Sequence, residues 1–399
     1  MNRDDFEILK SGLIYLDNGA TTLKPKCVIN KIVDYYTNYP SNAHRGDYKI
    51  SLKASSEYEL TREKLKNFIN AESKEEIVFT SGSTESLNMI VNGYFKYNLN
   101  QNDEVLITKA EHASNILPWY ELENEIGIKV KYIPLTNDHI VTLDNVKKSI
   151  TNNTKVISLA HISNVIGDVR PIKEIIKYAH EKGILVVVDG AQSVGHINVD
   201  VKNLDIDFMA MSAHKMCGPT GIGALYAKYE LLNKIVPYKF GGGMNVAFTS
   251  PENIEYMDLP YKLEAGTQNI EGVIGYGAAI EYINSIGIDN IEEYIDNLKR
   301  YLVDKLKEVN NINIYNENIE GSTLTFNIDK IFAQDVAIYL DKYNICVRSG
   351  EHCAKKLDDE LGIKNTVRVS LYFYNNKEDI DKLVNALKND KILEESIGL

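Results

Sequence analysis

Cysteine is scarce in this 399-residue chain, and its thiols show no metal-ligand spacing. The four cysteines, Cys27, Cys217, Cys346 and Cys353, form neither a C-x-x-C pair nor a cluster of the zinc-binding kind. In a reducing compartment most such thiols are small buried hydrophobic side chains. The pattern therefore argues against the common structural zinc motifs and predicts no metal site.

The chain also lacks long apolar runs and an excess of positive charge. No stretch approaches the roughly 20 apolar residues of a membrane span, and residues 1–6 lack the apolar core of a signal peptide. The formal net charge of -12 argues against a nucleic-acid backbone or an anionic membrane as a partner. We therefore expect a cytoplasmic protein that binds neither nucleic acid nor membranes.

Short apolar runs alternate with amphipathic segments between residues 75 and 226; one such segment, 172–180, is ended by Gly183. This alternation is typical of α/β proteins with a mostly parallel sheet and helices on both faces. The last two strands, joined by a Gly-Pro-Thr-Gly loop, could be antiparallel. No G-x-G-x-x-G turn follows the first strand, which counts against a nicotinamide-binding enzyme. The predicted strands cover residues 77–79, 104–108, 130–133, 156–159, 184–188, 208–211 and 223–226.

The rest of the chain predicts a smaller α/β unit. Residues 237–270 are punctuated by Gly and Pro with little periodicity, and a long helical region follows at 271–309. We expect a large cofactor-binding domain, residues 15–260, a small domain, residues 1–14 and 261–399, and an active site between them. The strands of the small unit are predicted at residues 322–327, 345–347 and 366–370.

Two charged residues follow apolar runs at the exits of predicted strands. Asp189 ends the run Val186-Val-Val, and Lys215 follows Met211-Ser-Ala-His. Such exits line the ligand crevice of an open parallel sheet. A lysine paired with an acid suits pyridoxal phosphate, because the amine forms a Schiff base and the carboxylate keeps the pyridine nitrogen protonated. The ordinary alternative is that Lys215 snorkels and Asp189 caps a helix.

Small hydroxyl residues surround a predicted helix N-terminus. Ser83 and Thr84 follow a strand and open an amphipathic helix, where free N–H groups can bind a phosphate. An ordinary N-cap box has the same sequence pattern. Ser212 and His214, beside the candidate lysine, would complete a phosphate site.

Further polar residues follow strands at the same edge of the sheet. His112 could stack on an aromatic cofactor ring, although a lone histidine is more often structural. Asn164 and Gln192 could hydrogen-bond to a ring hydroxyl. These three interpretations depend on the candidate lysine and acid beside them.

The predicted small domain supplies two arginines and a thiol. Arg348 and Arg368 lie at strand ends, and their planar guanidinium groups match a carboxylate such as that of an amino-acid substrate. Structural salt bridges are the alternative. Cys353, in the peptide Arg348-Ser-Gly-Glu-His-Cys353, is a candidate exposed and reactive thiol. The negative charge of Glu351 disfavours a thiolate there.

In this order, these peptides resemble those of the class V aminotransferase-like, fold-type I pyridoxal phosphate enzymes, above all the second-group (SUF-type) cysteine desulfurases. The resemblance covers nearly the whole chain. It implies a large domain with a mostly parallel sheet and a smaller C-terminal α/β domain. It rests on Tyr15-Leu-Asp-Asn-Gly-Ala-Thr-Thr22, Asn42-Ala-His-Arg-Gly46, Glu111-His112, His161-Ile-Ser-Asn164, Val188-Asp-Gly-Ala-Gln192, Ser212-Ala-His-Lys215, Glu264-Ala-Gly-Thr267 and Arg348-Ser-Gly-Glu-His-Cys353.

The resemblance implies a role for each candidate residue. Lys215 would form the Schiff base, Asp189 would contact the pyridinium nitrogen, and Cys353 would accept sulfur. Thr267 would reach the phosphate of the neighbouring subunit, because these enzymes are homodimers with shared sites. The remaining roles are phosphate binding by Thr84, Ser212 and His214, ring stacking by His112, ring-hydroxyl contacts by Asn164 and Gln192, and carboxylate binding by Arg368 and Arg348.

The implied reaction converts L-cysteine to L-alanine and leaves a persulfide on Cys353. An acceptor protein would take this sulfur for iron-sulfur cluster or other sulfur-compound assembly. Tyr48 and Glu351 depart from the family, which often has histidine at both positions. The alternatives are a selenocysteine lyase, a cysteine sulfinate desulfinase, a kynureninase-like or epimerase-like relative, which needs no persulfide cysteine, and a non-catalytic scaffold.

Overall fold

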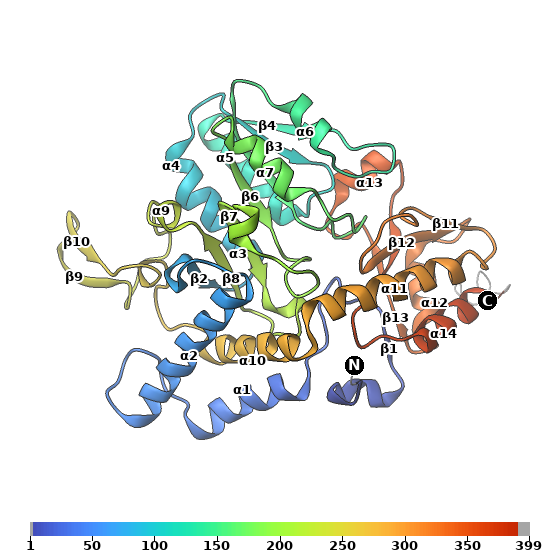
Figure 1. Cartoon of the computed structure of the whole chain (residues 1–399), viewed down its shortest axis with the longest axis horizontal. Coiled ribbons are helices and arrows are strands. Elements are labelled where there is room, and N and C mark those ends of the chain that lie inside the picture. The colour runs from blue at the N-terminus through green and yellow to red at the C-terminus, as the bar shows by residue number, and fades with distance from the viewer. Residues whose placement is uncertain (1–2, 390–399) are drawn as a thin grey trace.

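The structure, a computed structural model, describes residues 3–389 and is built around two β-sheets of unequal size (Figure 1). The larger has seven strands in the order β2-β8-β7-β6-β5-β3-β4, and the smaller has four in the order β11-β12-β15-β14. The predicted α/β class is therefore confirmed. The predicted domain boundary at residue 260 stays a prediction, and residues 1–2 and 390–399 of the predicted small domain lie outside the described residues.

Neighbouring strands of the large sheet are parallel except where β8 lies between β2 and β7, to both of which it is antiparallel. The prediction for the last pair is thus confirmed, because a short loop can join neighbouring strands only when they run in opposite directions. Each predicted strand is present. Their bounds are β2 Ile77–Thr80, β3 Glu104–Thr108, β4 Lys129–Ile133, β5 Thr154–Ala160, β6 Leu185–Asp189, β7 Phe208–Ser212 and β8 Gly223–Ala227.

The central strands are buried on both faces, which explains their continuous apolar runs. Val186 and Val188 of β6 pack into one core, and Val187 packs into a second core on the opposite face. The predicted helix 172–180 is confirmed as α7. The helices around this sheet are α3 Ser83–Ile90, α4 Lys96–Asn98, α5 Leu117–Ile126, α6 Leu143–Ser149, α7 Ile172–His180, α8 Val201–Leu204 and α9 Tyr229–Leu232.

Of three long helices, α1 Lys26–Asn38, α2 Lys49–Phe68 and α10 Ile270–Ile286, the last packs against the other two. A fourth, α11 Ile288–Leu306, runs on toward the small sheet (Figure 1). The helical region predicted at 271–309 is therefore two helices. The break lies at Gly287, whose φ of +90° is outside the helical range and is accessible to glycine.

The small sheet is antiparallel throughout. The strand predicted at 345–347 does not join it. Its residues form β13, which pairs in parallel with the N-terminal strand β1, and the chain then enters β14. The bounds in this part of the chain are β1 Ile14–Tyr15, β11 Ile312–Ile314, β12 Thr323–Ile328, α12 Ala333–Asp341, β13 Ile345–Cys346, β14 Arg348–Gly350, α13 Lys355–Leu361, β15 Thr366–Ser370 and α14 Lys377–Leu387.

A β-hairpin, β9 Asn245–Ser250 and β10 Asn253–Tyr256, projects from the body (Figure 1). It lies in the segment where little periodicity was found. The pattern missed it because neither face of the hairpin is buried by residues 3–389, so apolar and polar residues need not alternate. Val246 and Phe248 are 59% and 72% exposed.

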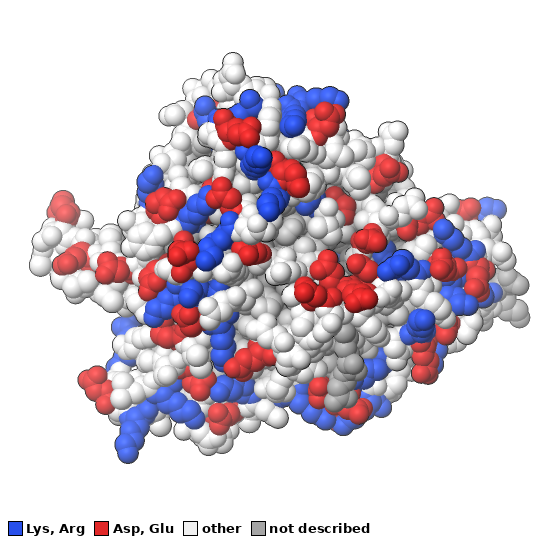
Figure 2. Space-filling view, in the orientation of Figure 1, with Lys and Arg blue, Asp and Glu red and all other residues white. Residues whose placement is uncertain are grey.

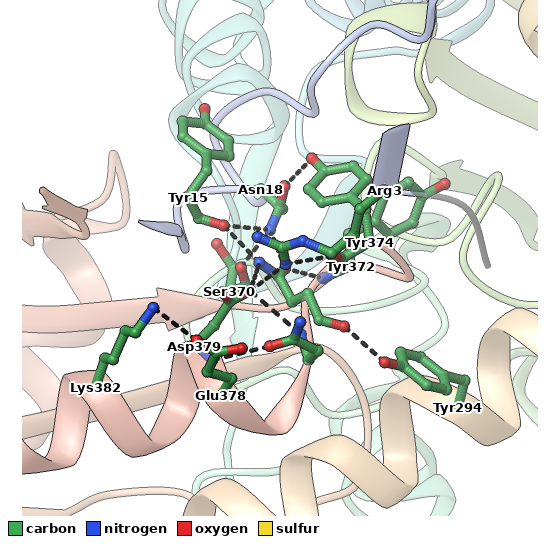
Figure 3. A network of polar contacts seen from close by, with 12 residues as sticks. Arg3, Tyr15, Asn18, Tyr294, Ser370, Tyr372, Tyr374, Glu378, Asp379 and Lys382 are labelled. Atoms are coloured by element: carbon green, nitrogen blue, oxygen red, sulfur yellow. Dashed lines mark hydrogen bonds and ion pairs between the residues drawn. The ribbon is translucent and has the colours of Figure 1, made fainter. Parts of the chain in front are cut away.

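Residues 15–24, here called the crossing segment, run from the small sheet to the large one. Figure 3 shows the polar network at its middle. The Tyr374 hydroxyl bonds to the Asn18 side chain and accepts a hydrogen bond from the Leu23 N–H at 2.8 Å. Arg3 Nη1 donates to the Tyr374 carbonyl at 2.7 Å. The C-terminal part of the chain therefore fixes the path of this N-terminal segment.

On the face in Figure 2, Lys and Arg side chains are interspersed with Asp and Glu. No helix among residues 3–389 is long and apolar enough to cross a membrane. The predicted absence of a nucleic-acid partner stays a prediction.

Candidate active site

A pocket of roughly 200 Å³ lies where the large sheet meets the small one. Strand ends position its polar lining, because Asp189 and Ser212 are the last residues of β6 and β7. Cys353 and Thr267 are the predicted residues that do not line it. Those that do are Ser83, Thr84, His112, Asn164, Asp189, Gln192, Ser212, His214, Lys215, Arg348 and Arg368.

Asp189 and Lys215 face the floor of the pocket. Burial raises the pKa of Asp189, and the nearby Lys215 opposes that shift. Burial also lowers the pKa of Lys215 to about 8, although Asp189 raises it. A lysine with a lowered pKa has a larger fraction of the neutral amine, which is the nucleophilic form. A cation bound against Asp189 would favour its carboxylate form.

Hydroxyl and amide groups gather at one end of the pocket. The Ser83 N–H donates to Ser212 Oγ at 2.8 Å, and the two hydroxyl oxygens are 2.9 Å apart. Thr84 Oγ1 lies 2.7 Å from Ser114 Oγ. Gly223 allows this approach, since a Cβ there would collide with the Met211 carbonyl and with Gly82 Cα. Together with the N-terminus of α3, these donors fit a phosphate.

His214 lines the same pocket and is neutral. Burial lowers its pKa to about 4, and the charges of Lys215 and Lys24 add to that effect. A neutral imidazole can donate or accept one hydrogen bond at each nitrogen, depending on its tautomer. Its position is compatible with the predicted phosphate contact, which stays a prediction.

His112 also lines the pocket as a neutral ring. Burial lowers its pKa to about 4, with further lowering by Lys215, Arg348 and Arg368. Its Nδ1 accepts a hydrogen bond from the Ser114 N–H at 3.1 Å, which fixes the orientation of the imidazole. A neutral ring held in this way is suited to stacking on an aromatic group.

The amide groups of Asn164 and Gln192 are already bonded to the backbone. Asn164 Nδ2 donates to the His352 carbonyl at 2.8 Å, and Gln192 Nε2 donates to the Gly19 carbonyl at 3.0 Å. Their predicted contacts with a ring hydroxyl stay predictions. What the structure adds is that Asn164 holds the peptide directly before Cys353.

The two arginines converge because Arg348 and Arg368 pair directly across β14 and β15. Arg368 is only 1% exposed. Its Nη1 donates to the Asn164 carbonyl at 2.9 Å and its Nη2 to Asp17 at 3.0 Å. Its Nε has no hydrogen-bond partner among the described residues. Because Arg368 lines the pocket, its planar guanidinium fits a carboxylate ligand there.

Cys353 is exposed beside the pocket, and Arg348 Nη2 lies 3.6 Å from its sulfur. Both His352 and Cys353 have left-handed backbones, with φ of +51° and +59°. The Ala113 N–H donates to the Cys353 carbonyl at 2.8 Å and helps to hold this conformation. The thiol is therefore presented by a loop that the large sheet restrains.

Glu351 does not stand alone beside the thiol, as the sequence suggested. Its carboxylate pairs with Lys355 Nζ at 3.0 Å, one turn along the chain. The cation in contact with the Cys353 sulfur is Arg348. A positive charge at that position can stabilise negative charge that develops on sulfur.

Thr267 lies outside the pocket and is exposed. Asn42 Nδ2 is 3.3 Å from its hydroxyl, and the region is fixed by a buried ion pair between Arg62 and Glu264 at 2.8 Å. The predicted role of Thr267 toward a neighbouring subunit stays a prediction.

The sequence interpretation gave no role to several buried or half-buried charges around the pocket. Asp17 pairs with Arg368, and burial raises the pKa of Asp17 even though Arg368 opposes the shift. Glu111 and Arg170 form a fully buried pair behind the pocket. The sequence could have indicated these ion pairs only by a charged residue among apolar neighbours, because the two partners of each pair are distant in sequence.

Comparison with known proteins gives consistent matches. Residues 14–383 match the family described as aminotransferase class-V. A probable cysteine desulfurase from Halalkalibacterium halodurans is 43% identical over 387 residues, covering 97% of this chain and 95% of that protein. A solved cysteine desulfurase structure from Escherichia coli has a TM-score of 0.92 and 37% identity over 98% of both chains. Another, from Thermococcus onnurineus NA1, has a TM-score of 0.93 and 36% identity, covering 100% of this chain and 98% of that one.

These matches confirm the resemblance and the fold class predicted from the sequence. They also agree with the pocket, whose lysine, acid, phosphate-type donors and arginine suit a pyridoxal phosphate enzyme. The chain belongs to the class-V aminotransferase family and, within it, to the cysteine desulfurases.

Proposed function

We propose that this protein is a pyridoxal phosphate-dependent cysteine desulfurase. It converts L-cysteine to L-alanine and transfers the sulfur through Cys353 to an acceptor protein, for iron-sulfur cluster or other sulfur-compound assembly. The observation that carries this proposal is the position of Cys353. Its loop is hydrogen-bonded to residues beside the Lys215 and Asp189 pocket, and its sulfur contacts a cation that lines that pocket.

The residues present fit the cofactor. Lys215 would hold it covalently, Asp189 would contact its ring nitrogen, and His112 would lie against the ring. The phosphate would occupy the donor groups of Ser83, Thr84, Ser212 and His214. When bound, the cofactor supplies an electron sink for the carbanion formed at the substrate Cα.

The protein side chains perform the remaining steps. Arg368, which lines the pocket beside Arg348, binds the substrate carboxylate and places Cα beside Lys215. The neutral Lys215 amine takes the Cα proton. The Cys353 thiolate then attacks the substrate sulfur, so a sulfur–sulfur bond forms while the substrate carbon–sulfur bond breaks. The electron pair of that bond returns to the carbon skeleton, which gains protons and leaves as alanine.

Incubation of cofactor-loaded protein with L-cysteine and a thiol reductant tests this function. We expect alanine and sulfide to accumulate in equal amounts and to exceed the enzyme concentration. A protein that carries the cofactor but acts only on selenocysteine or cysteine sulfinate would contradict the proposed substrate. A colourless protein without turnover would contradict the proposed enzyme class.

The enzyme is a homodimer with shared active sites, and its location is cytoplasmic. Two observations support the dimer. The hairpin β9–β10 projects from the body (Figure 1), its residues Val246 and Phe248 are exposed, and exposed apolar arms are typical of protein–protein contacts. Thr267 lies on the surface next to Asn42, where it can reach a second copy.

Phe248→Asp is expected to weaken the dimer by at least about 30-fold, because a buried interface aromatic is a common hot spot. Phe332→Asp is the matched control. Phe332 is also an exposed phenylalanine, at 67%, but it precedes α12 and is not part of the hairpin. Sedimentation equilibrium over a concentration series measures both. Equal dissociation constants for Phe248→Asp and the wild type would contradict a hairpin contact.

A further inference from the structure

The peptide that precedes Lys215 is held by an unusual set of donors. The His214 carbonyl accepts hydrogen bonds from the Thr22 N–H at 2.9 Å, Thr21 Oγ1 at 3.0 Å, Thr22 Oγ1 at 3.1 Å and Lys24 Nζ at 3.2 Å. On the other side of Lys215, the Cys217 N–H donates to Thr22 Oγ1 at 2.7 Å. The end of the crossing segment therefore clamps the backbone on both sides of the candidate Schiff-base lysine.

Lys24 contributes the only charge to this clamp. Its ammonium also donates to Thr21 Oγ1 at 2.9 Å and to the Thr22 carbonyl. No carboxylate pairs with it among residues 3–389, and burial lowers its pKa to about 8. An ammonium has three donor protons. Here the three acceptors are the Thr21 hydroxyl, the Thr22 carbonyl and the His214 carbonyl. This is not the geometry of a lysine that extends into solvent.

The other end of the crossing segment contacts the substrate side of the pocket. Arg368, which is proposed to bind the substrate carboxylate, donates a hydrogen bond to Asp17 at 3.0 Å. Between the two ends, the Tyr374 hydroxyl bonds to the Asn18 side chain (Figure 3), and it also accepts a hydrogen bond from the Leu23 N–H. One short stretch of backbone, fixed at its middle, thus joins the group that binds the substrate to the peptide that carries the catalytic amine.

We propose that Lys24 is a positioning residue for Lys215. Its ammonium holds the His214–Lys215 peptide in place and, through the crossing segment, sets the position of the Lys215 amine relative to Arg368. Its charge also acts on the site, because it lowers the pKa of His214. The turnover test of this role rests on the proposed function. The hydrogen bonds of the clamp do not, because they form within the protein alone.

The first test compares Lys24→Met with Lys26→Met. Lys26 is two residues away, but its side chain is 45% exposed and pairs with Glu7. In the cofactor-loaded protein, Lys24→Met is expected to lower kcat about tenfold with KM changed less than about twofold, because a charge-assisted hydrogen bond to the peptide is lost. Lys26→Met is expected to match the wild type. Lys24→Arg, which keeps a cationic donor, is expected to recover most of the lost kcat.

Two further readouts separate positioning from general stability. Removing a positive charge near Lys215 favours the protonated chromophore, so the pH midpoint of the visible band should rise in Lys24→Met and stay unchanged in Lys24→Arg. In the protein without cofactor, amide hydrogen exchange over residues 213–218 should speed up at least about tenfold in Lys24→Met. Exchange in the core strand β6 should remain as in the wild type.

Each possible result of these measurements either supports or overturns the proposed role of Lys24. Unchanged exchange over residues 213–218 in Lys24→Met would overturn the proposal whether or not the protein desulfurates cysteine. Faster exchange with an unchanged kcat and band midpoint would also overturn it, since the clamp would then have no effect on Lys215. If the wild type acquires no visible band, the proposed function fails, and the exchange measurement still decides whether Lys24 holds the peptide.

Discussion

Lys215→Ala is expected to remove the visible absorption band that arises from the covalent link between this lysine and the cofactor, and to lower alanine release from L-cysteine at least about 1,000-fold. Proton transfer by a positioned side chain typically contributes 10² to 10⁴ in rate, and this amine also makes the covalent link. No other lysine lines the pocket among the described residues. The cofactor would therefore remain bound only by its phosphate and ring contacts, and it should be lost on prolonged dialysis.

Lys202→Ala serves as the control for this experiment. Lys202 is an exposed lysine that pairs with Glu72 at 3.2 Å on the surface, so its removal should change neither the band nor the turnover. Absorbance spectra before and after dialysis, together with an alanine assay, measure both variants. Retention of the band and of turnover in Lys215→Ala would remove the basis for the assigned Schiff-base lysine.

Cys353→Ser is the second variant with a large expected effect. The serine hydroxyl is a far weaker nucleophile than a thiolate at neutral pH, so alanine and sulfide release should fall at least about 100-fold. The steps before sulfur transfer do not use this side chain. The variant should therefore bind the cofactor, and addition of L-cysteine should still change the visible spectrum.

Cys27→Ser is the matched control, because Cys27 is also exposed but lies in α1, outside the pocket lining. It should show wild-type turnover. Mass spectrometry of the wild type after cysteine addition without reductant should find one added sulfur on the peptide that contains Cys353. Full activity in Cys353→Ser, or the added sulfur on another cysteine, would show that the thiol has been assigned wrongly.

The parts of the fold that the sequence predicted are those set by local pattern. The exits of β6 and β7 were recognisable because both strands are buried on two faces and end abruptly at polar residues, and this placed Asp189 and Ser212 at the pocket. The break at Gly287 was missed, because α10 is apolar around most of its surface and the pattern continues across the glycine. The hairpin β9–β10 was missed because none of the residues that the structure describes covers it.

The ion pairs around the site could not be predicted from sequence patterns. Arg368 was a candidate from its place at a strand end, yet its ion pair with Asp17 joins residues 351 positions apart. Glu111 and Arg170 likewise meet only after the sheet has formed. Such pairs are chosen by the tertiary structure, and a single sequence carries no periodicity that reports them.

The pairing of β14 with β15 has a consequence for how this active site can diversify. Arg348 and Arg368 stand opposite each other on the two strands, while Cys353 lies in the connection between them. Insertions or deletions in the connection leave the register of the strands unchanged, because the hydrogen-bonded ladder fixes it. The arginine pair proposed to bind the carboxylate would thus keep its place, while the loop that carries the proposed sulfur-accepting Cys353 could be lengthened or shortened independently to suit a different acceptor.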